Sequence, residues 1–126
     1  MTGEAIKMAV KSANERLESA EILLKAGNFR DSVSRSYYAV LDISRALLLK
    51  GGISPKSHSG VIAKFGQLYI KTGQIQPKYG KMLSAIEESR LEADYDFEEI
   101  ISLDNAASVL SDAKLFVEEV SKFLDK

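Results

Sequence analysis

Two polar clusters interrupt sequence that otherwise favours α-helix. One reads SRSYYA at residues 34–39, and the other reads RLEADY at residues 90–95. In a packed helix such positions usually hold leucine or alanine, so arginine and tyrosine there indicate either a buried polar network or a site that binds a ligand. The chemistry open to the chain depends on which of these two roles the clusters have.

Arg90 has two acidic neighbours on its own helix face. Glu87 precedes it by three residues and Asp94 follows it by four, so the three side chains could form surface ion pairs of about 0.2–0.5 kcal/mol each. Alternatively, the planar guanidinium binds a phosphate, with Tyr95 stacking or hydrogen bonding beside it. Acidic neighbours oppose phosphate binding, so the local sequence slightly favours the ion pairs.

The adjacent tyrosines of the first cluster must face different neighbours. Tyr37 and Tyr38 are about 100° apart on a helix, so we expect one ring in the core and the other beside a cleft or an interface. Arg35 follows Asp31 by four residues and could pair with it on the surface. The alternative is that Arg35 and Tyr38 hold the phosphate and the base of a nucleotide.

The single histidine, His58, lies in the sequence SHSG at a predicted helix N-terminus. Free backbone N–H groups and the helix dipole favour an anion there and disfavour an imidazolium. A neutral His58 could therefore accept a proton beside a bound phosphate. The alternative is a local helix cap flanked by serines.

The remaining residue types exclude several kinds of chemistry. The chain has no cysteine, which excludes thiolate catalysis and cysteine-based metal sites and is typical of a reducing compartment. No acidic residue lies within fifteen positions of the histidine, so we predict no metal site. The sequence also lacks a phosphate-binding glycine loop and a serine-nucleophile motif, and we expect no cofactor.

Opposite charges are segregated along the chain, although its net charge is −1. Residues 44–85 include seven basic residues, Lys56 among them, and no Asp or Glu, whereas residues 87–99 include seven acidic residues and one arginine. The basic stretch could attract an anionic partner such as RNA, or let two copies associate through complementary charge. Ordinary solvated lysines are the alternative.

The hydrophobic pattern predicts five helices and no strand, because apolar residues recur every three or four positions in five segments. Gly27 and Gly51-Gly52 end the first two helices, and Pro77 suits the first turn of the fourth. Leu103 followed by Asp104 as N-cap begins the fifth. The first three segments are about residues 4–26, 29–50 and 57–72. The fourth begins near Pro77 and includes the cluster at Arg90, and the fifth follows the cap and extends to about Leu124.

Length and patterning predict one domain, residues 1–126, since this length buries roughly two thirds of the unfolded surface in one core. The helix at 29–50 is apolar or aromatic around most of its circumference, more than one core can cover, so we predict a homodimer that buries part of it or of the fourth helix. The sequence has no signal peptide and no apolar run of the roughly 18 residues that span a membrane. We therefore expect a cytoplasmic protein.

Three segments together resemble a known family. They are SRSYYAV at 34–40 with ALL at 46–48, PKSHSGV at 55–61, and RLEADY at 90–95. In this order they are similar to a small prokaryotic branch of the HEPN (higher eukaryotes and prokaryotes nucleotide-binding) domains, over nearly the whole chain. The resemblance implies an all-α, HEPN-like up-and-down four-helix bundle with an additional short helix, a homodimer, and a minimal nucleotidyltransferase partner encoded nearby in a toxin–antitoxin operon.

Catalytic HEPN domains resemble one another in an arginine followed, after four to six residues, by a histidine at which metal-independent RNA cleavage is thought to occur. Arg90 matches that arginine, but the histidine positions hold Tyr95, Asp96 or Phe97. Neither tyrosine nor aspartate replaces an imidazole near neutral pH, and His58 could do so only if the fold brings it beside Arg90. The candidate catalytic residues are Arg90, Tyr95 and His58, and the candidate ligand-binding residues are Arg35, Tyr38, Asp94 and Lys56.

We therefore expect a HEPN-type module that binds nucleotide or RNA and a nucleotidyltransferase partner, with catalysis lost or altered. One alternative is an active metal-independent endoribonuclease toxin, in which Arg90 stabilises the phosphorane and His58 or Tyr95 transfers the proton. The other is a purely structural dimerisation protein, in which both polar clusters are buried networks.

Overall fold

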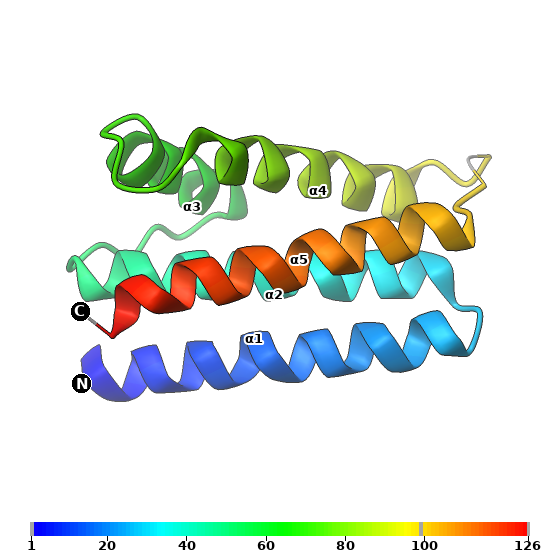
Figure 1. Cartoon of the computed structure of the whole chain (residues 1–126), viewed down its shortest axis with the longest axis horizontal. Helices are drawn as coiled ribbons and strands as arrows, with labels where there is room; N and C mark the ends of the chain where they lie inside the picture. Colours follow the sequence, from blue (N-terminus) through cyan, green and yellow to red (C-terminus); the bar gives the residue numbers. More distant parts are fainter. Residues whose placement is uncertain (1, 99, 126) are drawn as a thin grey trace.

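The computed structural model describes residues 2–98 and 100–125, and within these ranges it contains five α-helices and no strand (Figure 1). The predicted all-α fold with five helices is confirmed. One π-helical turn, η1, follows the third helix. The elements are α1 (Thr2–Lys25), α2 (Phe29–Lys50), α3 (His58–Phe65), η1 (Gly66–Ile70), α4 (Pro77–Tyr95) and α5 (Leu103–Leu124).

Four long helices form an up-and-down bundle, and α3 is the additional short helix (Figure 1). Helix α5 lies in front of α2 in this view, with α1 below them and α4 above. Helix α3 and its π turn lie beside the N-terminal half of α4. Contacts join α2 to each of the other four α-helices, so the polar cluster at residues 34–39 belongs to the central helix, and the cluster at residues 90–95 lies at the end of α4, which packs on it.

The prediction that the helix at 29–50 is central is confirmed, since thirteen of its residues are buried. The other helices of the same chain cover these side chains, however. The premise that one core cannot cover this helix is therefore wrong, and α2 supplies no argument for a homodimer. The large side chains it buries completely include Val33, Tyr37, Val40, Leu41, Ile43 and Leu48.

The helix ends are held by local hydrogen bonds, and one differs from the prediction. Gly27 has a φ of 83°, and the N–H of Asn28 donates to the carbonyl of Leu23 at 2.8 Å, which ends α1 as predicted. The N-cap of α5 is Ser102, whose hydroxyl accepts from the N–H of Asn105 at 3.1 Å. Asp104 lies inside the first turn instead, where its negative charge suits the helix dipole.

The helix predicted at 57–72 is shorter and changes its pitch. Helix α3 ends at Phe65, and the N–H of Lys71 then donates to the carbonyl of Gly66 at 2.8 Å, the five-residue spacing of a π turn. The extra residue in this turn rotates the following side chains away from a regular helical pattern. The start of α3 agrees with the prediction, because the hydroxyl of Ser57 caps this helix by accepting from the N–H of Gly60 at 3.0 Å.

No helix in the described part of the chain is long and apolar enough to span a membrane.

Candidate functional site

Arg90 of α4 lies against the ring of Tyr37 of α2. The guanidinium carbon is 4.5 Å from the ring centre, and Arg90 is only 9% exposed. A guanidinium on an aromatic face at this distance forms a cation–π contact. Tyr37 is completely buried, which confirms that one of the adjacent tyrosines belongs to the core.

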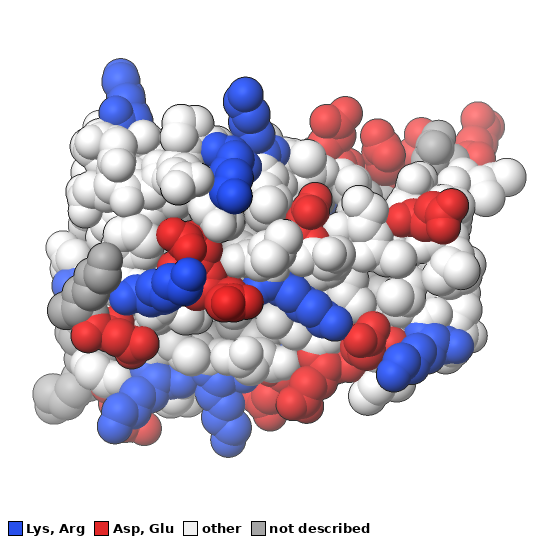
Figure 2. Space-filling model, in the orientation of Figure 1, with Lys and Arg blue, Asp and Glu red and all other residues white. Residues whose placement is uncertain are grey.

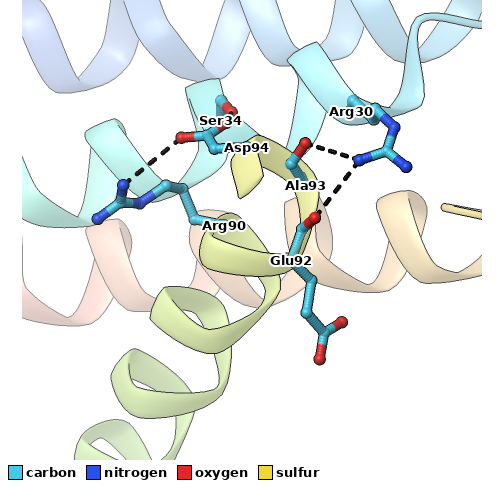
Figure 3. A network of polar contacts seen from close by, with 6 residues as sticks. All are labelled: Arg30, Ser34, Arg90, Glu92, Ala93 and Asp94. Atoms are coloured by element: carbon cyan, nitrogen blue, oxygen red, sulfur yellow. Dashed lines mark hydrogen bonds and ion pairs between the residues drawn. The ribbon is translucent and has the colours of Figure 1, made fainter. Parts of the chain in front are cut away.

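Asp94 links Arg90 to α2. A terminal nitrogen of Arg90 is 3.5 Å from Oδ2 of Asp94, and Oδ1 of Asp94 accepts a hydrogen bond of 2.6 Å from Ser34 (Figure 3). The predicted pairing of Arg90 with Asp94 is therefore present. It differs from a simple surface pair, because Arg90 is buried and because the carboxylate also contacts a second helix. Among the described residues, Glu87 makes no ion pair with Arg90.

Arg30 fixes the C-terminal end of α4 beside this pair. One of its terminal nitrogens donates to the carbonyl of Ala93 at 2.7 Å and lies 3.4 Å from that of Glu92 (Figure 3). Carbonyls in the last turn of a helix have no intrahelical partner. The first turn of α2 therefore positions the segment that carries Asp94 and Tyr95.

Helix α3 brings His58 to the two tyrosines. The ring centres of His58 and Tyr37 are 6.1 Å apart, those of His58 and Tyr38 are 5.7 Å apart, and those of the two tyrosines are 5.2 Å apart. These are distances at which aromatic rings interact. The helix cap is made by Ser57 and not by His58. His58 packs on these rings and remains exposed to solvent.

We use the name aromatic–arginine cluster for His58, Tyr37, Tyr38 and Arg90. Partial burial lowers the pKa of His58, and the positive charges of Arg45 and Arg90 lower it further, against the weaker opposing effect of Asp42. The imidazole is therefore neutral near pH 7. A neutral, exposed imidazole retains a nitrogen that can accept a proton.

For Tyr37 and for Arg90, burial and the neighbouring groups shift the pKa in opposite directions. Burial raises the pKa of Tyr37, and the nearby Arg90 opposes this shift. Burial alone would lower the pKa of Arg90, but Tyr37, Tyr38 and Asp94 outweigh that effect and raise it. Arg90 therefore stays charged, and Tyr37 stays neutral, at every pH of biological interest.

Three buried polar atoms of this region have no hydrogen-bond partner among the described residues. They are Nε of Arg90, the hydroxyl of Tyr37 and the hydroxyl of Ser36. The Tyr37 hydroxyl interacts electrostatically with Arg90, but without the geometry of a hydrogen bond. Such atoms are uncommon in native proteins, and each costs about 1–3 kcal/mol.

The second tyrosine contacts a residue that the sequence analysis missed. The guanidinium carbon of Arg16 in α1 is 5.2 Å from the ring centre of Tyr38, and Nε of Arg16 donates to Oδ2 of Asp42 at 2.8 Å. Ser12 donates to the same oxygen at 2.7 Å. The available signal was Asp42 itself, since a carboxylate within the apolar run at 40–43 needs a cationic partner.

Three predicted site residues lie at the edge of the cluster or outside it. Tyr95 is 69% exposed, with its ring centre 6.0 Å from the guanidinium carbon of Arg90. Arg35 is exposed and, among the described residues, makes no ion pair with Asp31 and no cation–π contact with Tyr38. Lys56 is exposed in the segment that precedes α3. The fold thus brings together His58, Tyr38, Arg90, Asp94 and Tyr95, but not Arg35.

Several grooves on the surface lie away from these residues. An open groove of about 510 Å³ lies at the turn between α1 and α2, and its lining includes Gly27, Phe29 and Phe97 but no member of the aromatic–arginine cluster. Within the described ranges, no group of three His, Asp or Glu side chains is arranged to hold a metal ion.

An all-α bundle that joins an arginine, two tyrosines and a histidine at its centre defines a helical module with a cationic, aromatic site. The model of the HEPN domain matches residues 6–123 of the sequence. The chain therefore belongs to the HEPN family, as the three sequence segments predicted.

Two relatives carry names that mention a toxin. The chain is 35% identical to "Putative toxin MJ0605" of Methanocaldococcus jannaschii, over 96% of the chain and 90% of the relative. It is 30% identical to "Putative toxin MJ0142" of the same organism, over 94% of the chain and 81% of the relative. A UPF0332 protein of Thermotoga maritima is 34% identical over 91% of the chain and 87% of its own length.

Proposed function

We propose that this HEPN-family chain binds single-stranded RNA at the aromatic–arginine cluster and acts as the toxin-like member of a two-protein pair. The observation that carries the proposal is that Arg90 and His58, from α4 and α3, both contact Tyr37 of α2. Arginine supplies charge for a phosphate, and exposed aromatic rings supply surfaces on which bases stack. The toxin names of two relatives support a function of this class.

The charge distribution supports an anionic ligand. Figure 2 shows basic side chains over the N-terminal half of α4 and the turn before it, and acidic side chains over the C-terminal half of α4 and the segment after it. Lys56 precedes α3, so the basic part of the surface begins next to His58. RNA would approach from this side and reach Arg90 where the acidic half of α4 begins.

Partners are part of the proposal. We expect the second protein to be a minimal nucleotidyltransferase encoded nearby, as the family resemblance implies. We also retain the homodimer, now on a different surface. Five large apolar side chains between residues 91 and 103 are exposed, and they include or adjoin the candidate site residues of α4: Leu91, Tyr95, Phe97, Ile100 and Leu103.

A second candidate function is metal-independent RNA cleavage, and the position of His58 favours it. His58 would accept the proton of a 2′-hydroxyl, the 2′-oxygen would attack the phosphorus, and Arg90 would stabilise the charge of the phosphorane. Tyr95 would donate a proton to the departing 5′-oxygen. The products would be a 2′,3′-cyclic phosphate and a 5′-hydroxyl.

Fluorescence anisotropy with labelled octauridylate tests the binding proposal. We expect Arg90→Gln to weaken binding at least tenfold at low salt, with Arg35→Gln as the matched control because Arg35 is an exposed arginine outside the cluster. Incubation of a longer RNA in EDTA tests the second candidate, since cleavage by the parent that is lost in His58→Gln would support it. A parent protein that does not bind RNA would leave the structural dimerisation protein as the better description.

A further inference from the structure

Arg16 is held in a preset orientation beside the aromatic–arginine cluster. Its Nε donates to Asp42 at 2.8 Å, and Ser12 holds the same carboxylate oxygen at 2.7 Å. The side chain of Asp42 is 13% exposed, whereas that of Arg16 is 35% exposed. In this pair the carboxylate of Asp42 is therefore mostly buried and the guanidinium of Arg16 is partly exposed.

This arrangement leaves most of the guanidinium available. A guanidinium carries five N–H donors in a planar fork, and Asp42 is the acceptor that Arg16 uses among the described residues. The four N–H groups of the two terminal nitrogens are therefore left for a ligand. An arginine whose orientation is fixed in advance loses less entropy when it forms a bidentate contact with a phosphate.

A simple structural ion pair would not require the other contact that Arg16 makes. Its guanidinium carbon lies 5.2 Å from the ring centre of Tyr38, whose ring in turn contacts Tyr37 and His58. The ring of Tyr37 in turn contacts the guanidinium of Arg90. Two arginines from different helices thus flank one group of three aromatic rings.

We propose that Arg16 is a second phosphate-binding residue, so that the site takes two phosphates of one RNA strand and is built for an oligonucleotide more than for a mononucleotide. This inference rests on the proposed RNA binding and names its ligand. Arg90 holds one phosphate, Arg16 holds another, and the rings of Tyr38 and His58 face the nucleotide between them. Asp42 is a positioning residue, because it acts on the ligand only by orienting the guanidinium of Arg16.

Binding of two probes, uridine 5′-monophosphate and octauridylate, tests the inference. We expect Arg16→Gln to weaken octauridylate binding at least fivefold, to reduce the slope of log affinity against log salt by about 0.7, and to leave binding of the monophosphate unchanged. Arg90→Gln should weaken binding of both probes. Lys7→Gln is the matched control, because it removes one positive charge from an exposed position of the same helix.

Arg16→Lys separates binding from folding. It keeps a positive charge beside Asp42 but removes the fork, so it should melt at the temperature of the parent and still bind octauridylate more weakly. If Arg16→Gln and Arg16→Lys both bind octauridylate as Lys7→Gln does, while Arg90→Gln binds weakly, the second phosphate contact is wrong and the proposed function stands. Equal weakening of both probes by Arg16→Gln would assign both arginines to one phosphate, which also overturns the inference. A parent protein that binds neither probe overturns the proposed function as well.

Discussion

Arg90 and His58 lie far apart in the sequence but contact the same ring, that of Tyr37. The guanidinium carbon of Arg90 is 4.5 Å from the ring centre, and the imidazole centre is 6.1 Å from it. The fold thus places the single histidine of the sequence near Arg90, although the positions four to six residues after Arg90 hold no histidine.

The burial of Arg90 predicts a cost in stability as well as in binding. Arg90→Ala should lower the free energy of unfolding by about 1–3 kcal/mol, because it removes a stacked, buried side chain and leaves Asp94 with Ser34 as its remaining partner. Urea denaturation of the two proteins measures the difference. The control is Arg35→Ala, for which we expect a change within about 0.5 kcal/mol, since Arg35 is exposed. Equal free energies of unfolding for the three proteins would contradict the buried packing of Arg90.

The hydrogen bond between Ser34 and Asp94 joins α2 to α4 and predicts a smaller effect. Ser34→Ala should cost about 0.5–1.5 kcal/mol, the net contribution of one hydrogen bond. Ser84→Ala removes a hydroxyl from an exposed position of α4 and serves as the control. A thermal melt of each variant gives the comparison, and a Ser34→Ala protein as stable as the parent would show that the bond contributes nothing.

Asp42 should be among the polar residues most sensitive to truncation. Asp42→Ala leaves both Ser12 and Arg16 without their acceptor, so we expect a loss of about 1–3 kcal/mol in denaturant unfolding. Glu15→Ala, at an exposed position of α1, should change stability by less than about 0.5 kcal/mol. Similar small losses in both variants would mean that the Asp42 pair behaves as an ordinary surface ion pair.

The pKa of His58 should lie below its ordinary value of about 6.5. Because its folded pKa is lowered, protons bind preferentially to the unfolded chain, and the contribution of His58 to stability is lost as pH falls from about 6.5 through the folded pKa. Arg45→Gln should raise the pKa toward the ordinary value, since it removes a nearby positive charge. The imidazole NMR signals followed against pH report both values. A pKa at or above 6.5 in the parent would contradict the assigned environment.

The sequence predicted the elements of the fold well, because each helix carries its own periodic pattern and its own stop signal. Helix α2 has the predicted bounds, and Gly27 and Pro77 lie where their conformational preferences placed them. The π turn after Phe65 and the cap at Ser102 were not predicted. Both depend on which of several similar local hydrogen bonds the packed chain adopts.

The site was predicted in part, because its residues have distinctive types but their contacts are between helices. Arg90, Tyr38 and His58 were identified, yet sequence spacing could not place His58 on Tyr37. Arg16 was missed because its partner, Asp42, lies twenty-six residues away on another helix. The choice between a buried network and an exposed site was also too narrow, since Arg90 is buried and yet contacts the same ring, that of Tyr37, as the exposed His58.

If RNA binds at the aromatic–arginine cluster, the imidazole of the single histidine reports the binding directly. Addition of octauridylate to the parent protein should shift the imidazole NMR signals of His58 and raise its pKa, because a bound phosphate favours the protonated ring. The same addition to Arg90→Gln should produce a much smaller shift at equal RNA concentration. RNA that binds with full affinity while the His58 signals and pKa stay unchanged would place the RNA elsewhere on the molecule and contradict the account.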